Sequence, residues 1–142
     1  MNIGFTGTQV GMTPMQFLRV AQFIAKNQID SAHSGDCIGA DKEFHELILL
    51  ANNNKDFPTI RTVGHIPDDD SKRAFCKYDY TRPAQPYIER NHSIVNCCDY
   101  LIATPKEKKE KLRSGTWATV RYAKKIKRAG MIVFPDGSIE SF

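Results

Sequence analysis

Three short segments of the sequence combine glycine with small hydroxyl or carboxylate side chains, a composition suited to holding a phosphate or a sugar. They are Gly4–Thr8, Ser34–Asp41 and Ser114–Thr116. Backbone N–H groups at the start of a helix have no partner within the helix, and glycine lets an anion approach them closely. We therefore expect these segments to form an anion-binding site, although each also suits an ordinary turn or helix cap.

Polar side chains elsewhere in the chain can complete such a site. Arginine binds phosphate through paired hydrogen bonds and asparagine can position a sugar hydroxyl, so Arg90 and Asn91 are candidates, with an exposed helix face as the alternative. His65 closes a predicted strand at the same sheet edge. Asp36 or Asp41 can accept hydrogen bonds from ribose, or Asp41 can cap a helix. The candidate ligand-binding residues are Gly7, Thr8, Ser34, Gly35, Asp36, Gly39, Asp41, His65, Arg90, Asn91, Ser114, Gly115 and Thr116.

Short apolar runs that favour β-structure alternate with helix-like patterns along the chain, which predicts a parallel sheet. We expect an α/β, Rossmann-like fold with a mainly parallel sheet of about five strands and helices on both faces. Residues 1–142 should form a single domain. The predicted strands are Ile3–Thr6, Thr59–Val63, Tyr100–Thr104 and Met131–Phe134, with a weaker candidate at Ile29–His33.

The predicted helices start at clear signals. Thr13 caps the first helix, the second begins near Asp41, and Pro86 opens the third. The last helix is expected from about Thr116 to Arg128, with Gly130 as its stop.

Residues 64–83 form a long polar stretch that we expect to contain only short helical turns. A connection of this length inside a compact domain often has a function.

The composition is that of a globular protein, with 41% hydrophobic and 25% charged residues. No apolar run is long enough for a membrane span, and no leader pattern follows Met1. We expect a cytoplasmic protein of a bacterial or phage-infected cell that does not contact a membrane. The four cysteines include no C-x-x-C pair, so we expect reduced thiols, no metal and no other cofactor.

The formal net charge is +4, with basic residues concentrated in Lys106–Arg113 and Arg121–Arg128. This balance favours anionic ligands only weakly. Nucleic acid is therefore a possible but less favoured partner.

The glycine segments, together with Arg90-Asn91, occur in the order seen in the SLOG superfamily, and the resemblance spans nearly the whole chain. That superfamily includes the lonely-guy phosphoribohydrolases, DprA-type DNA-processing proteins and nucleotide-sensing domains of bacterial and phage conflict systems. The resemblance implies a Rossmann-like fold, a nucleotide-type ligand and a homo-oligomer. Because its motifs are short, it is specific to the superfamily more than to one activity.

The catalytic loop of the phosphoribohydrolases is matched only in part. Their loop reads P-G-G-x-G-T-x-x-E, and its glutamate works with an arginine on the N-glycosidic bond of a nucleoside monophosphate. The resemblance covers Gly115 and Thr116, but the doubled glycine is missing and Thr119 stands at the glutamate position. Arg90 resembles the family arginine, which without an acid does little to activate water. The candidates for catalysis are Arg90, Glu89, Asp36 and Asp41.

The leading hypothesis is a protein that binds a nucleotide or nucleotide-derived signal, such as an ADP-ribose-like molecule or a cyclic nucleotide, for sensing or sequestration. The alternative is an N-glycosidase that acts on nucleoside 5′-monophosphates. A third hypothesis is a DprA-like, DNA-associated accessory protein, which the modest charge surplus places last.

Overall fold

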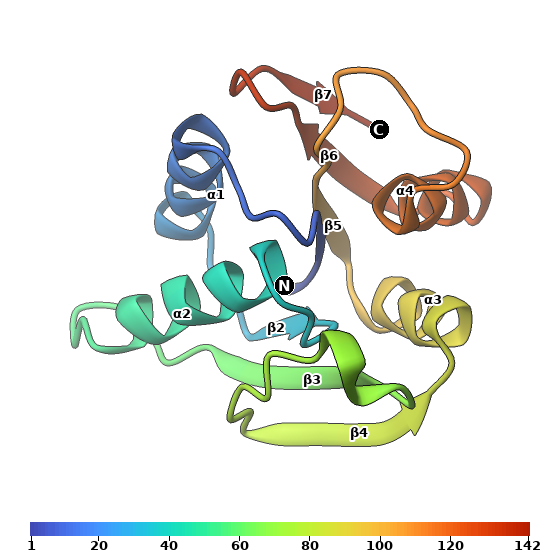
Figure 1. The fold of residues 1–142 in the computed structure, drawn as a ribbon. Helices are drawn as coiled ribbons and strands as arrows, with labels where there is room; N and C mark the ends of the chain where they lie inside the picture. Colours follow the sequence, from blue (N-terminus) through green and yellow to red (C-terminus); the bar gives the residue numbers. More distant parts are fainter.

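Seven strands form one sheet, and four α-helices cover its two faces (Figure 1). The computed structural model describes all residues from Met1 to Phe142. The sheet order is β4-β3-β2-β1-β5-β6-β7, and all neighbouring strands are parallel except β6 and β7. The Rossmann-like α/β fold predicted from the alternation is confirmed. The strands are β1 (Asn2–Gly7), β2 (Ser31–Ser34), β3 (Arg61–Pro67), β4 (Tyr80–Gln85), β5 (Tyr100–Thr104), β6 (Ala129–Val133) and β7 (Ile139–Ser141).

Two strands, β4 and β7, lie outside the five that the sequence pattern predicts. The expectation that residues 64–83 hold only short helical turns is wrong, because β3 runs to Pro67 and β4 begins at Tyr80. Only one short 3₁₀ turn, η1 (Asp70–Lys72), lies between them. As an edge strand, β4 is largely exposed and tolerates Pro83, so it carries no apolar alternation. The three-residue β7 is also exposed, so it too lacks an apolar pattern that would predict a strand.

The helices are α1 (Pro14–Lys26), α2 (Ala40–Asn52), α3 (Tyr87–Cys97) and α4 (Gly115–Lys125). None of them combines the length and apolar character needed to cross a lipid bilayer. The predicted start of α1 is confirmed, since the Thr13 and Gln16 side chains each accept a hydrogen bond from the other residue's backbone N–H.

The predicted end of the last helix is wrong. The helix stops at Lys125, and Lys127 takes a left-handed backbone conformation with φ of 59°. Lys127 therefore occupies the helix-terminating position that glycine usually fills. Gly130 lies within β6 instead.

Each face of the sheet buries its own apolar layer. Phe5 of β1 stacks on Phe44 of α2 with ring centroids 4.3 Å apart, in the layer shared with α1. In β5, Ile102 faces this layer, whereas its neighbours Leu101 and Ala103 pack with α3 and α4 on the other face. This period of two residues is what a strand buried on both faces requires.

The direction in which strands are added reverses beside β1. The chain places β2, β3 and β4 on one side of β1, and α3 then returns it to β5 on the other side. The connections that leave β1 and β5 therefore diverge at the carboxyl edge of the sheet. Open α/β folds bind ligands in the crevice formed at such a switch point.

Candidate functional site

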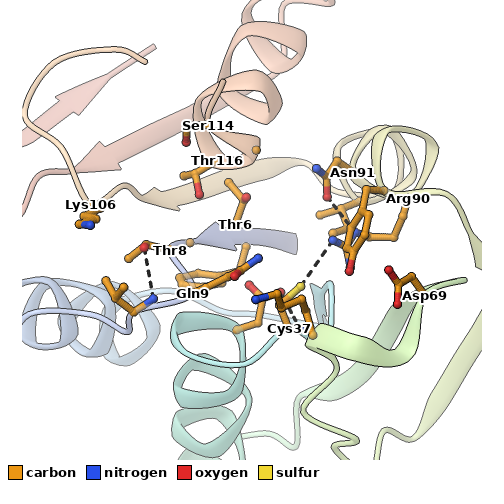
Figure 2. A pocket seen from close by; sticks show the side chains of 18 of the residues that line it. Thr6, Thr8, Gln9, Cys37, Asp69, Arg90, Asn91, Lys106, Ser114 and Thr116 are labelled. Atoms are coloured by element: carbon orange, nitrogen blue, oxygen red, sulfur yellow. Dashed lines mark hydrogen bonds between the residues drawn. The ribbon is translucent and has the colours of Figure 1, made fainter. Parts of the chain in front are cut away.

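A cavity of about 590 Å³ opens at this switch point (Figure 2). Its walls come from the end of β1, from the loops after β1, β2 and β5, from η1, from the first two turns of α3 and from the start of α4. Sites for small molecules usually have volumes of roughly 300–1,000 Å³, so a nucleotide-sized ligand fits. Eight of the predicted ligand-binding residues line the cavity: Gly7, Thr8, Asp41, Arg90, Asn91, Ser114, Gly115 and Thr116.

The start of α4 forms one wall. The Ser114 hydroxyl accepts a hydrogen bond from the Trp117 N–H at 3.3 Å and so caps the helix. A Cβ atom at Gly115 would meet nothing within 4 Å, so the backbone there borders open space. The Thr116 hydroxyl is directed toward the cavity and toward Thr6 (Figure 2). The free N–H groups and the positive end of the helix dipole favour an anion at this wall.

Charged side chains of both signs line the cavity. Lys106, after β5, and Lys72, in η1, are exposed at its walls, where they attract anionic ligands. Glu107 contributes a carboxylate oxygen, Oε2, that is buried without a hydrogen-bond partner. The site thus offers acceptors as well as cations, which suits a ligand that carries an anion and hydrogen-bond donors. The charged lining residues are Asp41, Asp69, Lys72, Arg90, Lys106 and Glu107.

Arg90 is 4% exposed, and the protein already uses most of its N–H donors. Its Nη1 donates to the carbonyls of Gly35 and His65, and its Nε donates to Asn91 Oδ1 at 2.8 Å. Its Nη2 lies 3.6 Å from the Cys37 sulfur. Arg90 therefore gives the cavity a fixed positive charge, and Nη2 is the atom best placed to reach a ligand.

Asp41 lies in the same wall as Arg90, with 6% of its surface exposed. Its Oδ2 accepts a hydrogen bond from the Cys37 N–H at 3.1 Å. Burial raises the pKa of Asp41 to about 6, since it outweighs the opposing attraction of Arg90. A carboxyl group that titrates near neutral pH inside a cavity has the properties of a general acid or base.

The rest of the Ser34–Asp41 loop mainly holds the fold together. The fully buried Asp36 carboxylate accepts hydrogen bonds from Arg73 Nε at 3.0 Å and from the Cys76 N–H at 2.9 Å. The Ser34 hydroxyl is hydrogen-bonded to that of Tyr78 at 3.2 Å. These contacts tie the loop to the segment between η1 and β4. Within Ser34–Asp41, Cys37 and Asp41 line the cavity, whereas Ser34 and Asp36 do not.

Two glycines of this loop allow close approaches. A Cβ atom at Gly35 would lie 2.6 Å from Arg90 Nη1, so the missing side chain makes room for the guanidinium. Gly39 has a φ of 85°, and the next N–H, that of Ala40, donates to the Thr8 carbonyl at 3.0 Å. Neither glycine lines the cavity, but both position residues that do.

Three further residues singled out from the sequence lie away from the cavity. His65 is 1% exposed and hydrogen-bonded to His33, and Glu89 is exposed on α3. The Thr119 hydroxyl donates to the Gly115 carbonyl at 2.8 Å within α4. Neither Glu89 nor Thr119 therefore supplies the cavity with the acid that the phosphoribohydrolase loop carries.

The sequence pattern did not single out several residues that line the cavity. Lys106 and Glu107 follow β5 at the same edge as Thr8, so their position after a parallel strand was a usable signal. Asp69 and Lys72 reach the cavity because the Lys72 carbonyl accepts a hydrogen bond from the Ile38 N–H at 2.9 Å. No local sequence pattern predicts this long-range hydrogen bond.

The basic run after β5 is partly neutralised within the chain. Lys108 pairs with Asp136 at 3.2 Å, and Arg121 of α4 pairs with Glu110 at 2.8 Å. These pairings reduce the charge available for a nucleic-acid backbone.

Two solved structures resemble the protein in fold. The molybdenum cofactor binding protein from the phototrophic bacterium Rippkaea orientalis aligns with a TM-score of 0.65 and 19% identity, over 93% of this chain and 75% of that one. The Northeast Structural Genomics Consortium target TM1055 aligns with a TM-score of 0.63 and 14% identity, over 92% of this chain and 72% of that one. No protein-family profile and no curated protein matches the sequence. At these identities the similarities show the Rossmann-like fold and not an activity.

Proposed function

We propose that the cavity binds a nucleotide or a nucleotide-derived ligand, with a phosphate at the start of α4. The observation that carries the proposal is the open space above Gly115, where the backbone of an eleven-residue helix begins at the cavity wall. Lys106 and the Thr116 hydroxyl line the same cavity and add charge and a donor. Together they provide the donor set that phosphate binding needs.

The remainder of the cavity favours a ligand larger than phosphate alone. Asp69 and Glu107 offer acceptors to sugar hydroxyls or base amino groups, and Asn91 lies beside Arg90 on the opposite wall (Figure 2). A protein that holds such a ligand without transforming it acts as a sensor or a sequestering protein.

The molybdenum cofactor is a second ligand candidate, favoured by the fold similarity to the molybdenum cofactor binding protein from Rippkaea orientalis. It combines a heterocycle with a phosphate, so its phosphate would bind to the same N–H groups at the start of α4. The two candidates differ in the ring that the opposite wall must recognise.

The first test is mass spectrometry of any small molecule released when the purified protein is denatured, followed by calorimetric titration with nucleotides, ADP-ribose and cyclic nucleotides. We expect one of these to bind in a one-to-one complex. Thr116→Val should weaken that complex about tenfold, because it removes one hydroxyl of the phosphate site. Thr119→Val is the matched control, since its hydroxyl bonds within α4 and does not line the cavity. Failure of every phosphate-bearing ligand to bind would refute the proposal.

A second candidate function, N-glycosidic hydrolysis of nucleoside 5′-monophosphates, is favoured by Asp41. Its raised pKa and its position beside Arg90 in the cavity are what an acid that protonates a leaving base requires. In this scheme Asp41 gives its proton to the base as the bond to the sugar breaks and water adds to the sugar carbon. The proton that the water loses returns to Asp41, so one water is consumed and the acid is regenerated.

Chromatography of reaction mixtures separates the two functions. Hydrolysis predicts release of free base from a nucleoside monophosphate, abolished in Asp41→Asn, while Glu89→Gln retains full turnover because Glu89 does not line the cavity. Recovery of intact nucleotide after long incubation would rule out the enzyme and leave the binding protein.

A further inference from the structure

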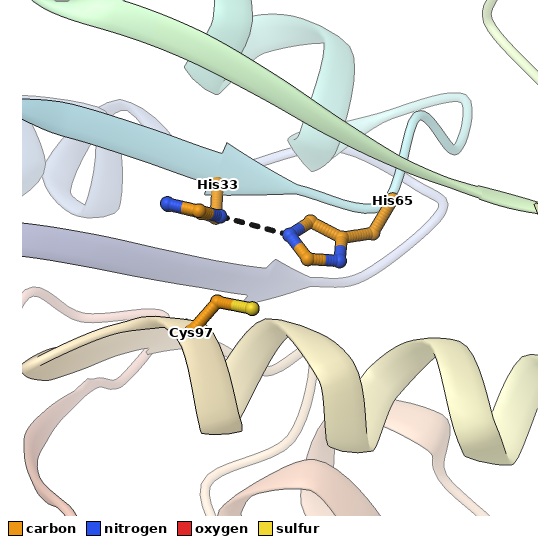
Figure 3. Close-up of side chains that lie close together, drawn as sticks. All are labelled: His33, His65 and Cys97. Carbon is orange, nitrogen blue, oxygen red and sulfur yellow. Dashed lines mark hydrogen bonds between the residues drawn. The ribbon is translucent and has the colours of Figure 1, made fainter. Parts of the chain in front are cut away.

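Three side chains able to bind a metal ion meet beneath the sheet, away from the residues that line the cavity (Figure 3). His33 of β2, His65 of β3 and Cys97 of α3 each offer one ligand atom, and these atoms lie within 4.8 Å of one another. The two histidines are buried and Cys97 is half-buried. Figure 3 shows the Cys97 side chain extending from α3 into the space below the imidazole pair. Their wide separation in the sequence leaves no motif spacing to reveal them.

The hydrogen bonds around His33 define which nitrogen is free to coordinate. The Ser31 hydroxyl donates to Asn2 Oδ1 at 2.8 Å, so its oxygen must accept the proton of His33 Nε2, which lies 2.9 Å away. His33 Nδ1 therefore presents a lone pair, which faces His65 Nε2 at 2.8 Å. His65 Nε2 carries the shared proton, and His65 Nδ1 is left buried without a partner.

We propose that His33, His65 and Cys97 form a three-coordinate site for Cu(I). Two imidazoles and one thiolate in a trigonal arrangement suit copper, and thiolate ligands select its monovalent state. Binding releases the Cys97 thiol proton to solvent and moves the His65 proton from Nε2 to Nδ1, which frees Nε2 for the metal. One proton therefore leaves for each ion bound.

The surroundings favour Cu(I) over Zn²⁺. A monovalent ion and a thiolate make a neutral unit, which is cheaper to bury than a charged one. Zn²⁺ with the same ligands would leave one positive charge close to Arg61 and Arg82, whose charges already act on His33. Zinc sites also usually take four ligands, and this cluster supplies three.

The Ser31–Asn2 pair is a positioning element for this site. It holds the His33 ring in the tautomer that directs a lone pair at the cluster. Outer partners of this kind typically change metal affinity by roughly 10- to 100-fold.

The experiment is an anaerobic titration of the full-length protein with Cu(I) in competition with bicinchoninate, a coloured Cu(I) chelator. We expect one Cu(I) per chain and release of one proton. Cys97→Ser should weaken binding at least about 100-fold, and Ser31→Ala about 10-fold, with circular dichroism confirming that both variants are folded. Cys98→Ala and Cys76→Ser are the thiol controls and should bind as the wild type does, since neither belongs to the cluster.

X-ray absorption of the copper complex should show two nitrogen ligands and one sulfur ligand. Binding that survives unchanged in Cys97→Ser, or a spectrum with sulfur ligands alone, would overturn the site. Tighter binding of Zn²⁺ than of Cu(I) would overturn the choice of metal. None of these outcomes depends on the nucleotide cavity, because Cys97 does not line it.

Discussion

The start of α4 and the loop after β2 occupy the same edge of the sheet and have similar compositions, yet they use their polar groups differently. At α4 the backbone of Gly115 borders open space, and Lys106 stands nearby in the same cavity. In the loop after β2, Asp36 is fully buried and bonded to Arg73. One glycine-containing segment at this edge thus leaves its backbone free at a cavity wall, whereas the other is bonded within the fold.

Hydrogen-bond partners, and not residue types, distinguish the two roles. A buried polar group must be satisfied, so one whose partners all come from the chain serves stability. One that lacks partners at a cavity wall remains available for a ligand. Variants at the two regions should therefore separate stability from binding.

The largest effect is expected for Asp36→Ala. Removing the buried Asp36 carboxylate takes away the partner of Arg73 Nε and of the Cys76 N–H, and losing the buried member of such a pair costs roughly 3–5 kcal/mol of unfolding free energy. Asp70→Ala is the matched control, because Asp70 pairs with the same arginine at 3.3 Å but is 69% exposed, and should cost less than about 1 kcal/mol. Urea unfolding measures the loss of free energy in both variants. Equal losses would show that the buried contacts of Asp36 do not stabilise the loop after β2 more than an exposed ion pair does.

Asp41 belongs to the loop after β2 but also lines the cavity. The dependence of stability on pH tests whether its carboxyl group is buried there. A carboxyl group whose pKa rises to about 6 in the folded state binds protons that the unfolded chain releases, so stability falls as the pH increases from about 4 to about 6. Asp41→Asn should remove this slope and add up to about 3 kcal/mol near pH 8. Burial lowers the pKa of His33 to about 4 and that of His65 to about 3. These two shifts act in the opposite direction, because stability is lost as the pH falls below about 6.5.

The difference between wild type and Asp41→Asn therefore isolates the carboxyl group, since both proteins share the histidines. Urea unfolding across this pH range measures it. Parallel stability curves for the two proteins would show that Asp41 is not the group that titrates.

Ser114 caps α4 and lines the cavity, so its variants test the two roles separately. Ser114→Ala should lower stability by about 1 kcal/mol through loss of the cap. Ser114→Asp restores an N-cap but places a negative charge where the phosphate is proposed to bind. It should therefore keep the stability and lose ligand affinity, as thermal unfolding and calorimetry will show; unchanged affinity in Ser114→Asp would contradict an anion site at α4.

The smallest stability effect is expected for Lys106→Ala, within about 0.5 kcal/mol, because the side chain is exposed. Ligand affinity should nevertheless fall about tenfold in low salt, and by less in high salt, where the charge is screened. Lys109→Ala, an exposed lysine of the same loop outside the cavity, is the control. Equal losses in both lysine variants would mean that overall charge, and not this wall, attracts the ligand.

The sequence alone predicted the parallel α/β sheet, five of its strands and the capped start of α1. These features follow from local patterns, since alternation, apolar runs and capping residues act over a few positions. The edge strand β4 could not be predicted in this way. Its residues are mostly exposed, and its pairing with β3 is a long-range event that leaves no apolar signal.

For the site, position after a parallel strand was enough to place Thr8 and the Ser114–Thr116 turn at one sheet edge. Only the tertiary structure decided that Asp36 bonds within the fold, that Lys72 reaches the cavity, and that His33, His65 and Cys97 meet. The physical reason is that burial and hydrogen-bond partners come from segments far apart in the chain. Residue type determines which bonds a side chain can form, and its neighbours in the fold determine which of its polar atoms remain available for a ligand.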